Sequence, residues 1–153
     1  MFSLPRKTAL FAAVVFSLGL AHAAYAGDWR LKDKDGAHYS LSGLSGKWVL
    51  VNFWAPWCPP CLAEMSDLNV LQQRHRELQV IGVAVMYGSR KEVLDVVNHK
   101  SISYPIVFGN EDTAGDFGGL DGTPTSFLYS PSGKLVDHFV GPMKLADVER
   151  KMH

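Results

Sequence analysis

The chain has 153 residues, of which 47% are hydrophobic, and its 15 basic side chains balance 15 acidic ones. This length predicts a single domain whose core is large enough to be stable without disulfide staples. The sequence holds no basic block and no stripe of Arg and Lys with interleaved aromatic residues. It therefore disfavours a nucleic acid as a partner.

Residues 1–26 have the pattern of a secretory signal peptide. Arg6 and Lys7 precede a short apolar run, and Ala24-Tyr-Ala26 offers a cleavage site. Cleavage there would leave residues 27–153 as one slightly acidic domain outside the cytoplasm. An uncleaved membrane anchor is the alternative, although the apolar run is short for a membrane span.

The first predicted elements after the signal form a β-hairpin. Short strands around Trp29–Leu31 and His38–Leu41 flank an Asp35-Gly36 turn. Trp48–Phe53 is then a nearly continuous apolar run, as expected for a strand that is buried on both faces. Asn52 is the one polar residue in that run.

Helices and strands alternate over the rest of the chain, which ends in an antiparallel strand pair and a helix. Ser89 and Glu92 have the spacing of a capping box at one helix start. This order predicts an α/β fold with a central mixed β-sheet flanked by helices. We expect helices over 59–76, 89–100 and 144–153, one or two helical turns over 111–117, and strands over 78–85, 105–108, 125–129 and 135–140.

Cys58 and Cys61 are the only cysteines, and they lie where the Trp48–Phe53 strand gives way to a helix. Two residues three apart on a first helical turn share one face, at a separation that a disulfide can bridge. A reversible dithiol is therefore the leading hypothesis for this pair.

The residues between the cysteines indicate how such a dithiol would react. With Cys58 as N-cap and Pro59 at the first helical position, the helix N-terminus should acidify the Cys58 thiol and make it the nucleophile. Because Pro60 also lacks an N–H, chiefly the amide of Cys61 remains to stabilise the Cys58 thiolate. A weakly stabilised reduced form favours a reductant over a strong oxidant.

The segment Val51-Asn-Phe-Trp-Ala-Pro-Trp-Cys-Pro-Pro-Cys61 is similar to the active-site segment of thioredoxin-fold proteins. The position of Glu64, three residues after Cys61, is similar to that in the extracytoplasmic TlpA/ResA-like branch of these proteins. The segment Asp121–Lys134 strengthens the resemblance. The resemblance covers most of residues 27–153. It implies a thioredoxin-like fold with an N-terminal β-hairpin extension, in a bacterial periplasmic monomer.

The same resemblance implies roles for residues outside the cysteine pair. Pro124 is expected to follow a cis peptide bond beside the dithiol, and the backbone of Thr123 to dock the substrate peptide. In thioredoxins an acid occupies the place of Asn52, so that proton acceptor is absent here. Glu64 is then the candidate for deprotonating Cys61.

Together these residues predict thiol–disulfide exchange that uses no cofactor and no metal. Cys58 attacks a disulfide in a client protein, a mixed disulfide forms against the surface of Trp57 and Thr123-Pro124, and Cys61 resolves it. The resemblance implies a membrane thiol–disulfide carrier as electron donor. It also implies apocytochrome c haem-attachment thiols or copper-delivery proteins as clients.

Other interpretations of the cysteine pair remain open. A disulfide oxidase or isomerase would use the same residues in the other direction. Two thiolates can also bind Cu(I), assisted by Met65 or Met86, in a copper carrier that is not a catalyst. A permanent structural disulfide in a binding module is the third alternative.

Two further classes of site lack the residues that they need. A structural zinc site needs four ligands, and the sequence has neither a second Cys pair nor a His pair at ligand spacing. A peroxidase of the related peroxiredoxin type needs Pro and Thr or Ser at the places that Val51 and Ala55 occupy before Cys58.

Overall fold

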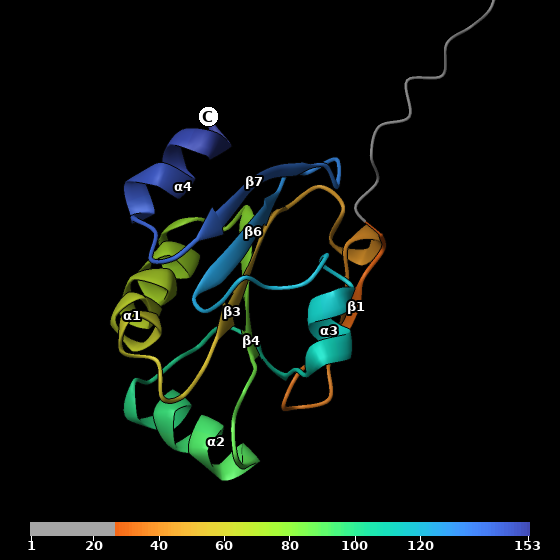
Figure 1. Cartoon of the computed structure of the whole chain (residues 1–153). Coiled ribbons are helices and arrows are strands. Elements are labelled where there is room, and N and C mark those ends of the chain that lie inside the picture. The colour runs from red at the N-terminus through yellow and green to blue at the C-terminus, as the bar shows by residue number, and fades with distance from the viewer. Residues whose placement is uncertain (1–26) are drawn as a thin grey trace, which may run out of the picture.

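The computed structural model describes residues 27–153, and the signal peptide predicted over residues 1–26 lies outside this range. Among the described residues, none of the helices is both long enough and apolar enough to span a membrane. A five-stranded mixed sheet forms the centre of the domain, in the order β5-β4-β3-β6-β7 (Figure 1). Its strands are β3 (Trp48–Trp54), β4 (Leu78–Ala84), β5 (Ile106–Phe108), β6 (Thr125–Tyr129) and β7 (Leu135–Val140).

The pairing of the central strand β3 places one polar residue in the middle of an apolar face. β3 runs parallel to β4 and antiparallel to β6, and Asn52 lies opposite Gly82 on one side and Ser126 on the other. Because directly paired residues of neighbouring strands point to the same face, these three form a short row across the sheet.

Three helices cover that face of the sheet. They are α1 (Pro59–Arg74), α2 (Arg90–His99) and α4 (Leu145–Met152), and each contributes side chains to the larger of two buried apolar clusters. In Figure 1, α1 and α4 lie together on the side of the sheet away from β1 (Arg30–Lys32). The site described below is buried under α1.

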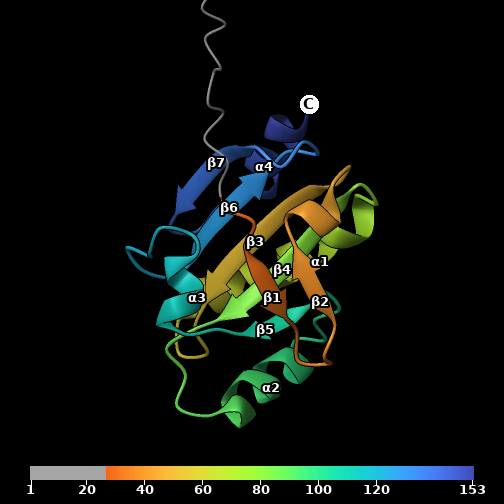
Figure 2. The same cartoon turned by 90° about the vertical axis from the view of Figure 1, so that its right-hand side faces the viewer.

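The opposite face is covered by the N-terminal hairpin and by α3 (Glu111–Gly115), which Figure 2 turns toward the viewer. The hairpin pairs β1 (Arg30–Lys32) with β2 (His38–Ser40), and Gly36 takes a φ of +91° in its turn. The indole of Trp29 stacks on Phe117 with ring centroids 5.5 Å apart. This contact fastens the hairpin to the segment that follows α3.

The predicted fold class and the order of its elements are confirmed. The strands expected over 125–129 and 135–140 have those bounds, whereas the first helix ends at Arg74, two residues earlier than predicted. The capping box at α2 is half formed. Ser89 Oγ accepts the N–H of Glu92 at 3.4 Å, but the Glu92 carboxylate accepts the N–H of Gly88 in place of that of Ser89.

Candidate active site

The two cysteines form a disulfide at the junction between β3 and α1. A turn closed by the Cys58 N–H donating to the Ala55 carbonyl at 3.2 Å ends the strand segment. Cys58 is the N-cap of α1, and Pro59 and Pro60 are its first two residues, so the helix begins where the sequence predicts. The Cα atoms of Cys58 and Cys61 are 5.3 Å apart.

The two sulfur atoms have different neighbours. The Sγ of Cys58 lies 3.6 Å from the carbonyl oxygen of Thr123, whose peptide bond to Pro124 is cis. Cys58 is 3% exposed and Cys61 is not exposed at all. The structure thus brings the Thr123-Pro124 segment to Cys58, 65 residues away in the sequence.

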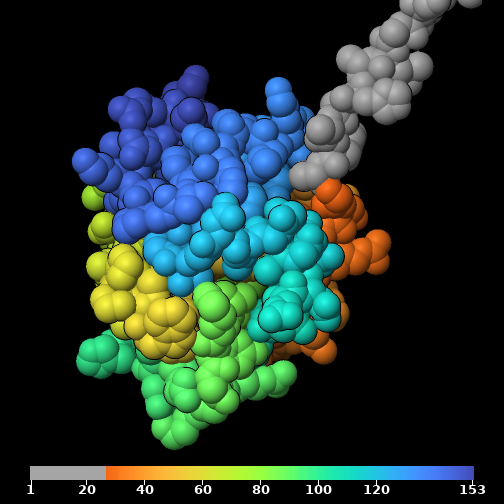
Figure 3. Space-filling view, in the orientation of Figure 1, coloured from red at the N-terminus to blue at the C-terminus, as the bar shows by residue number. Residues whose placement is uncertain are grey.

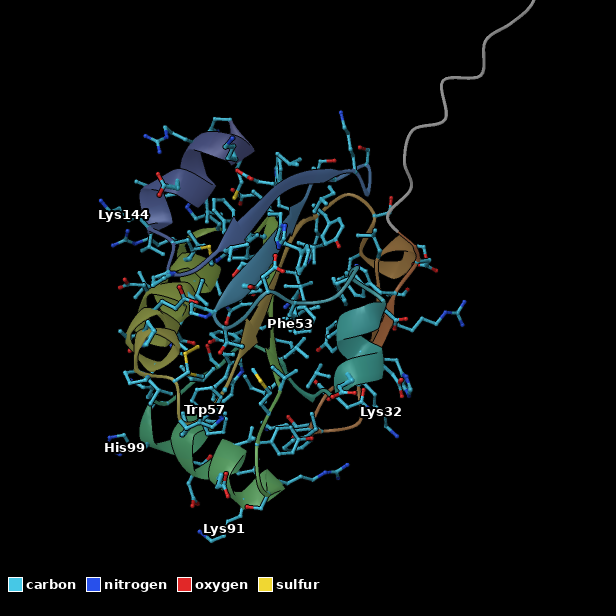
Figure 4. The ribbon with its side chains drawn as sticks, in the orientation of Figure 1. Lys32, Phe53, Trp57, Lys91, His99 and Lys144 are labelled. Carbon is cyan, nitrogen blue, oxygen red and sulfur yellow. A yellow bond between two sulfur atoms is a disulfide. The ribbon has the colours of Figure 1, made fainter. Side chains whose placement is uncertain are left out.

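Trp57 lies on the outer surface next to this pair and is 62% exposed. Its indole Nε1 donates to the carbonyl oxygen of Met86 at 2.7 Å, which ties the α1 start to the loop after β4. Figure 4 labels Trp57 between α1 and α2. Met86 is itself 55% exposed and has a φ of +51°. Trp54, in contrast, is fully buried in the core, as is Met65.

Glu64 lies one helical turn after Cys61 and points into the protein, where it is 5% exposed. Its Oε1 accepts a hydrogen bond from Asn52 Nδ2 at 2.8 Å, and its Oε2 accepts the N–H of Met143 at 3.2 Å. Burial raises the pKa of Glu64, although these two hydrogen bonds act in the opposite direction. A buried carboxyl of raised pKa is suited to accept and release a proton inside the protein.

Further polar atoms are buried on the face of the sheet that α1 covers. Within residues 27–153, the Asn52 Oδ1, Trp54 Nε1 and Tyr104 hydroxyl are buried without a hydrogen-bond partner. Burial, together with the charge of Glu64, raises the pKa of Tyr104. A Cβ on Gly82 would come 2.9 Å from the Tyr104 ring and 3.3 Å from Trp54 Nε1, so glycine there leaves room for both rings.

The segment that connects β7 to α4 also reaches the site, although the sequence does not indicate it. The Gly141 N–H donates to the Pro124 carbonyl at 2.9 Å, and the Met143 N–H donates to Glu64. This connection therefore touches both the cis-proline segment and the buried carboxyl. A Gly-Pro pair after a strand signals a turn, but no sequence pattern shows which backbone N–H groups reach the site.

A disulfide at a strand-to-helix junction, beside a cis-proline segment and above a buried carboxyl, defines a thioredoxin-like thiol–disulfide oxidoreductase. Residues 23–138 match the AhpC/TSA family, and the chain belongs to that family. The predicted resemblance to ResA-like proteins and the enzyme class are confirmed.

Named relatives extend over most of the chain. The thioredoxin-like protein YneN of Bacillus subtilis is 30% identical over 139 residues, which cover 88% of this chain and 81% of YneN. The thiol-disulfide oxidoreductase ResA of Geobacillus thermodenitrificans is 31% identical over 134 residues, covering 87% of this chain and 77% of ResA.

A solved structure gives the same result for the fold. The thiol:disulfide interchange protein of Chlorobium tepidum, a thioredoxin family protein, is 32% identical with a TM-score of 0.72. The match covers 82% of this chain and 90% of that one.

Proposed function

We propose that this protein is a periplasmic reductase of disulfides in partner proteins and that it acts as a monomer after cleavage of residues 1–26. The signal pattern in the sequence supports export. The observation that carries the proposal is the placement of the two sulfurs. Cys58 Sγ lies against the Thr123 carbonyl at 3.6 Å, whereas Cys61 is fully buried behind it.

In the proposed reaction the Cys58 thiolate attacks one sulfur of a client disulfide, and the other client sulfur leaves as a thiolate. The client backbone docks along Thr123-Pro124, and the exposed indole of Trp57 adds an apolar contact surface. The Cys61 thiolate then attacks Cys58 Sγ and releases the client's second thiolate. The client gains two electrons, and the Cys58–Cys61 disulfide forms.

Glu64 takes the proton that Cys61 must lose before it can attack. The two residues are three apart on α1 and therefore share one face of the helix. The Glu64 carboxyl is fixed by a hydrogen bond on each oxygen, and its pKa is raised by burial. Both properties suit a general base that works inside the protein.

The surroundings of Cys58 support electron flow toward the client. Among residues 27–153, no N–H or O–H group donates to Cys58 Sγ, and the polar atom that meets it is a carbonyl oxygen. Pro59 and Pro60 have no N–H to offer a Cys58 thiolate once the disulfide is reduced, and a less stabilised thiolate makes the reduced form a better electron donor. We propose a membrane thiol–disulfide carrier as the source of electrons, and apocytochrome c or copper-delivery proteins as clients.

The reduction potential of the Cys58–Cys61 pair tests the direction. Purified residues 27–153 are equilibrated with thiol–disulfide buffers of known potential, and free thiols are counted. A reductase is expected near or below about −230 mV, in the range of thioredoxin-like reductants. A value near about −120 mV would make the protein an oxidant and reverse the proposed reaction.

A further inference from the structure

A groove with a volume of about 810 Å³ lies next to Met86, whose carbonyl accepts the Trp57 hydrogen bond. It runs between the loop after β4, the start of α3 and the loop that leads to Thr123. This volume is in the range of pockets that bind ligands in proteins. Much of its lining is apolar, contributed by Val85, Met86, Tyr87, Ala114 and Leu120.

The groove is continuous with the proposed reaction site. Met86 lines it and accepts the indole hydrogen bond of Trp57, and Gly122 lines it immediately before Thr123. Figure 3 shows the green segment after β4 beside the cyan segment around α3, with the yellow segment of Trp57 next to them on the same face. A polypeptide docked along Thr123-Pro124 would therefore lie next to this groove.

The polar side chains of the groove carry negative charge. Glu111 and Asp121 line it, both are exposed, and its lining contains no Lys, Arg or His. The segment 109–122 as a whole has four acidic residues and no basic one. Within the described part of the chain, none of these four carboxylates forms an ion pair.

We propose that this groove, lined by Glu111 and Asp121, binds an apolar segment of the client polypeptide that carries Lys or Arg and lies next to the client's disulfide. The inference rests on the proposed function, and it adds the substrate class. The apolar lining provides contact area for the client's side chains. The two carboxylates favour cationic neighbours and disfavour acidic ones, which gives selectivity as well as attraction.

Three synthetic peptides with one internal disulfide test the charge and the apolar contact separately. The first has two Leu next to the disulfide and two Lys beyond them, the second replaces Lys with Glu, and the third replaces Leu with Ser. Rate constants for reduction by the reduced protein are measured at low ionic strength. We expect the first peptide to react about tenfold faster than either of the others.

The groove is then tested by charge reversal with a matched control. Glu111→Lys/Asp121→Lys reverses the two carboxylates that line the groove, and should remove or invert the preference for Lys over Glu peptides. Asp112→Lys/Asp116→Lys makes the same change in net charge around α3 but outside the lining. It should keep most of the preference.

A small neutral disulfide, 2-hydroxyethyl disulfide, separates this inference from the proposed function. All variants should reduce it at the rate of the unmodified protein, because it does not reach the groove. Equal rates for the three peptides, or an equal loss of preference in both double variants, would overturn the groove proposal alone. A protein that reduces neither the peptides nor the small disulfide would overturn the proposed function.

Discussion

Cys58 and Cys61 share one covalent bond, but the chain surrounds them in different ways. On the outer side, Cys58 lies beside the exposed Trp57 and against the Thr123 carbonyl. On the inner side, Cys61 is fully buried and lies one turn before the carboxyl of Glu64, which is hydrogen-bonded in the interior. Contact with a partner needs an accessible surface, whereas control of a proton needs a site shielded from water.

The inner side is also the more highly constrained of the two. Glu64 is held by Asn52 from β3 and by the Met143 backbone from the segment before α4, so three distant parts of the chain meet there. On the outer side of the described domain, Trp57 donates to the Met86 carbonyl and the Gly141 N–H donates to the Pro124 carbonyl, so each contact joins only two segments. We therefore expect inner substitutions to change both rate and stability, and outer ones other than that of the nucleophile Cys58 to change mainly recognition.

Replacing either cysteine should have the largest effect on client reduction, and the two variants should stop the reaction at different steps. Cys58→Ser is expected to abolish client reduction and to form no covalent complex, because the attacking group is gone. Cys61→Ser should accumulate a mixed disulfide with the client, because the resolving thiol is absent. Non-reducing gels followed by mass spectrometry measure both outcomes. If the Cys58→Ser protein instead forms a mixed disulfide through Cys61, then Cys61 is the nucleophile and Cys58 the resolving cysteine.

Glu64→Gln should slow resolution of the mixed disulfide by about 10²-fold, the usual scale for loss of a general base. Burial raises the pKa of Glu64 above its ordinary value of 4.5, and only the carboxylate form accepts a proton. The rate of the unmodified protein should therefore rise with pH through that pKa, and the variant should lose this inflection. Stopped-flow measurements over a range of pH check the profile.

Asp67→Asn is the control for that experiment. The charge of Asp67 contributes to the raised pKa of Glu64, so its removal should move the inflection to lower pH without abolishing it.

The pH dependence of protein stability gives a second readout of the Glu64 pKa. Because the folded-state pKa of Glu64 is raised, the stability that its protonated form contributes is complete below the unfolded pKa and is lost as pH rises through the folded pKa. Glu64→Gln should flatten that part of the urea-unfolding profile.

Asn52→Ala should have a smaller effect on rate and a clear effect on stability. It removes the donor to Glu64 Oε1 and leaves buried acceptors unpaired, at a cost of about 1–3 kcal/mol in free energy of unfolding. The same loss should raise the pKa of Glu64 further and move the rate inflection to higher pH. Ser126→Ala removes the other partner of Asn52 Nδ2 and should leave the inflection in place. If Asn52→Ala and Ser126→Ala shift the pH of the rate inflection equally, Asn52 does not act through its hydrogen bond to Glu64.

The sequence predicted the outer side better than the inner one, for a physical reason. The Cys-Pro-Pro-Cys spacing, the N-cap at Cys58 and the β3 strand are local properties, and each could be derived from neighbouring residues. The pairing of Cys58 with Thr123-Pro124 needed the family resemblance, because 65 residues separate the two segments. Such contacts are set by sheet order, which local periodicity does not specify.

The inner hydrogen bonds were beyond prediction for a related reason. Asn52 and Glu64 were each identified as unusual, but their mutual hydrogen bond depends on how α1 crosses β3. The Met143 contribution is a backbone N–H, which every non-proline residue possesses, so its sequence identity carries no signal. The groove beside Met86 likewise arises from loops far apart in the chain.

Trp57→Ala tests the outer side and should have the smallest effect on the protein itself. Trp57 is mostly exposed but donates a hydrogen bond to Met86, so the free energy of unfolding should fall by about 1 kcal/mol. Reduction of a client protein should slow about fivefold, which corresponds to loss of roughly 1 kcal/mol of contact energy. Reduction of 2-hydroxyethyl disulfide should be unchanged.

The control is Trp54→Phe, because Trp54 is fully buried. This substitution should lower stability but should not change the ratio between the rates of client reduction and of 2-hydroxyethyl disulfide reduction. Equal slowing with the client and with the small disulfide would mean that Trp57 acts on the dithiol and not on the partner.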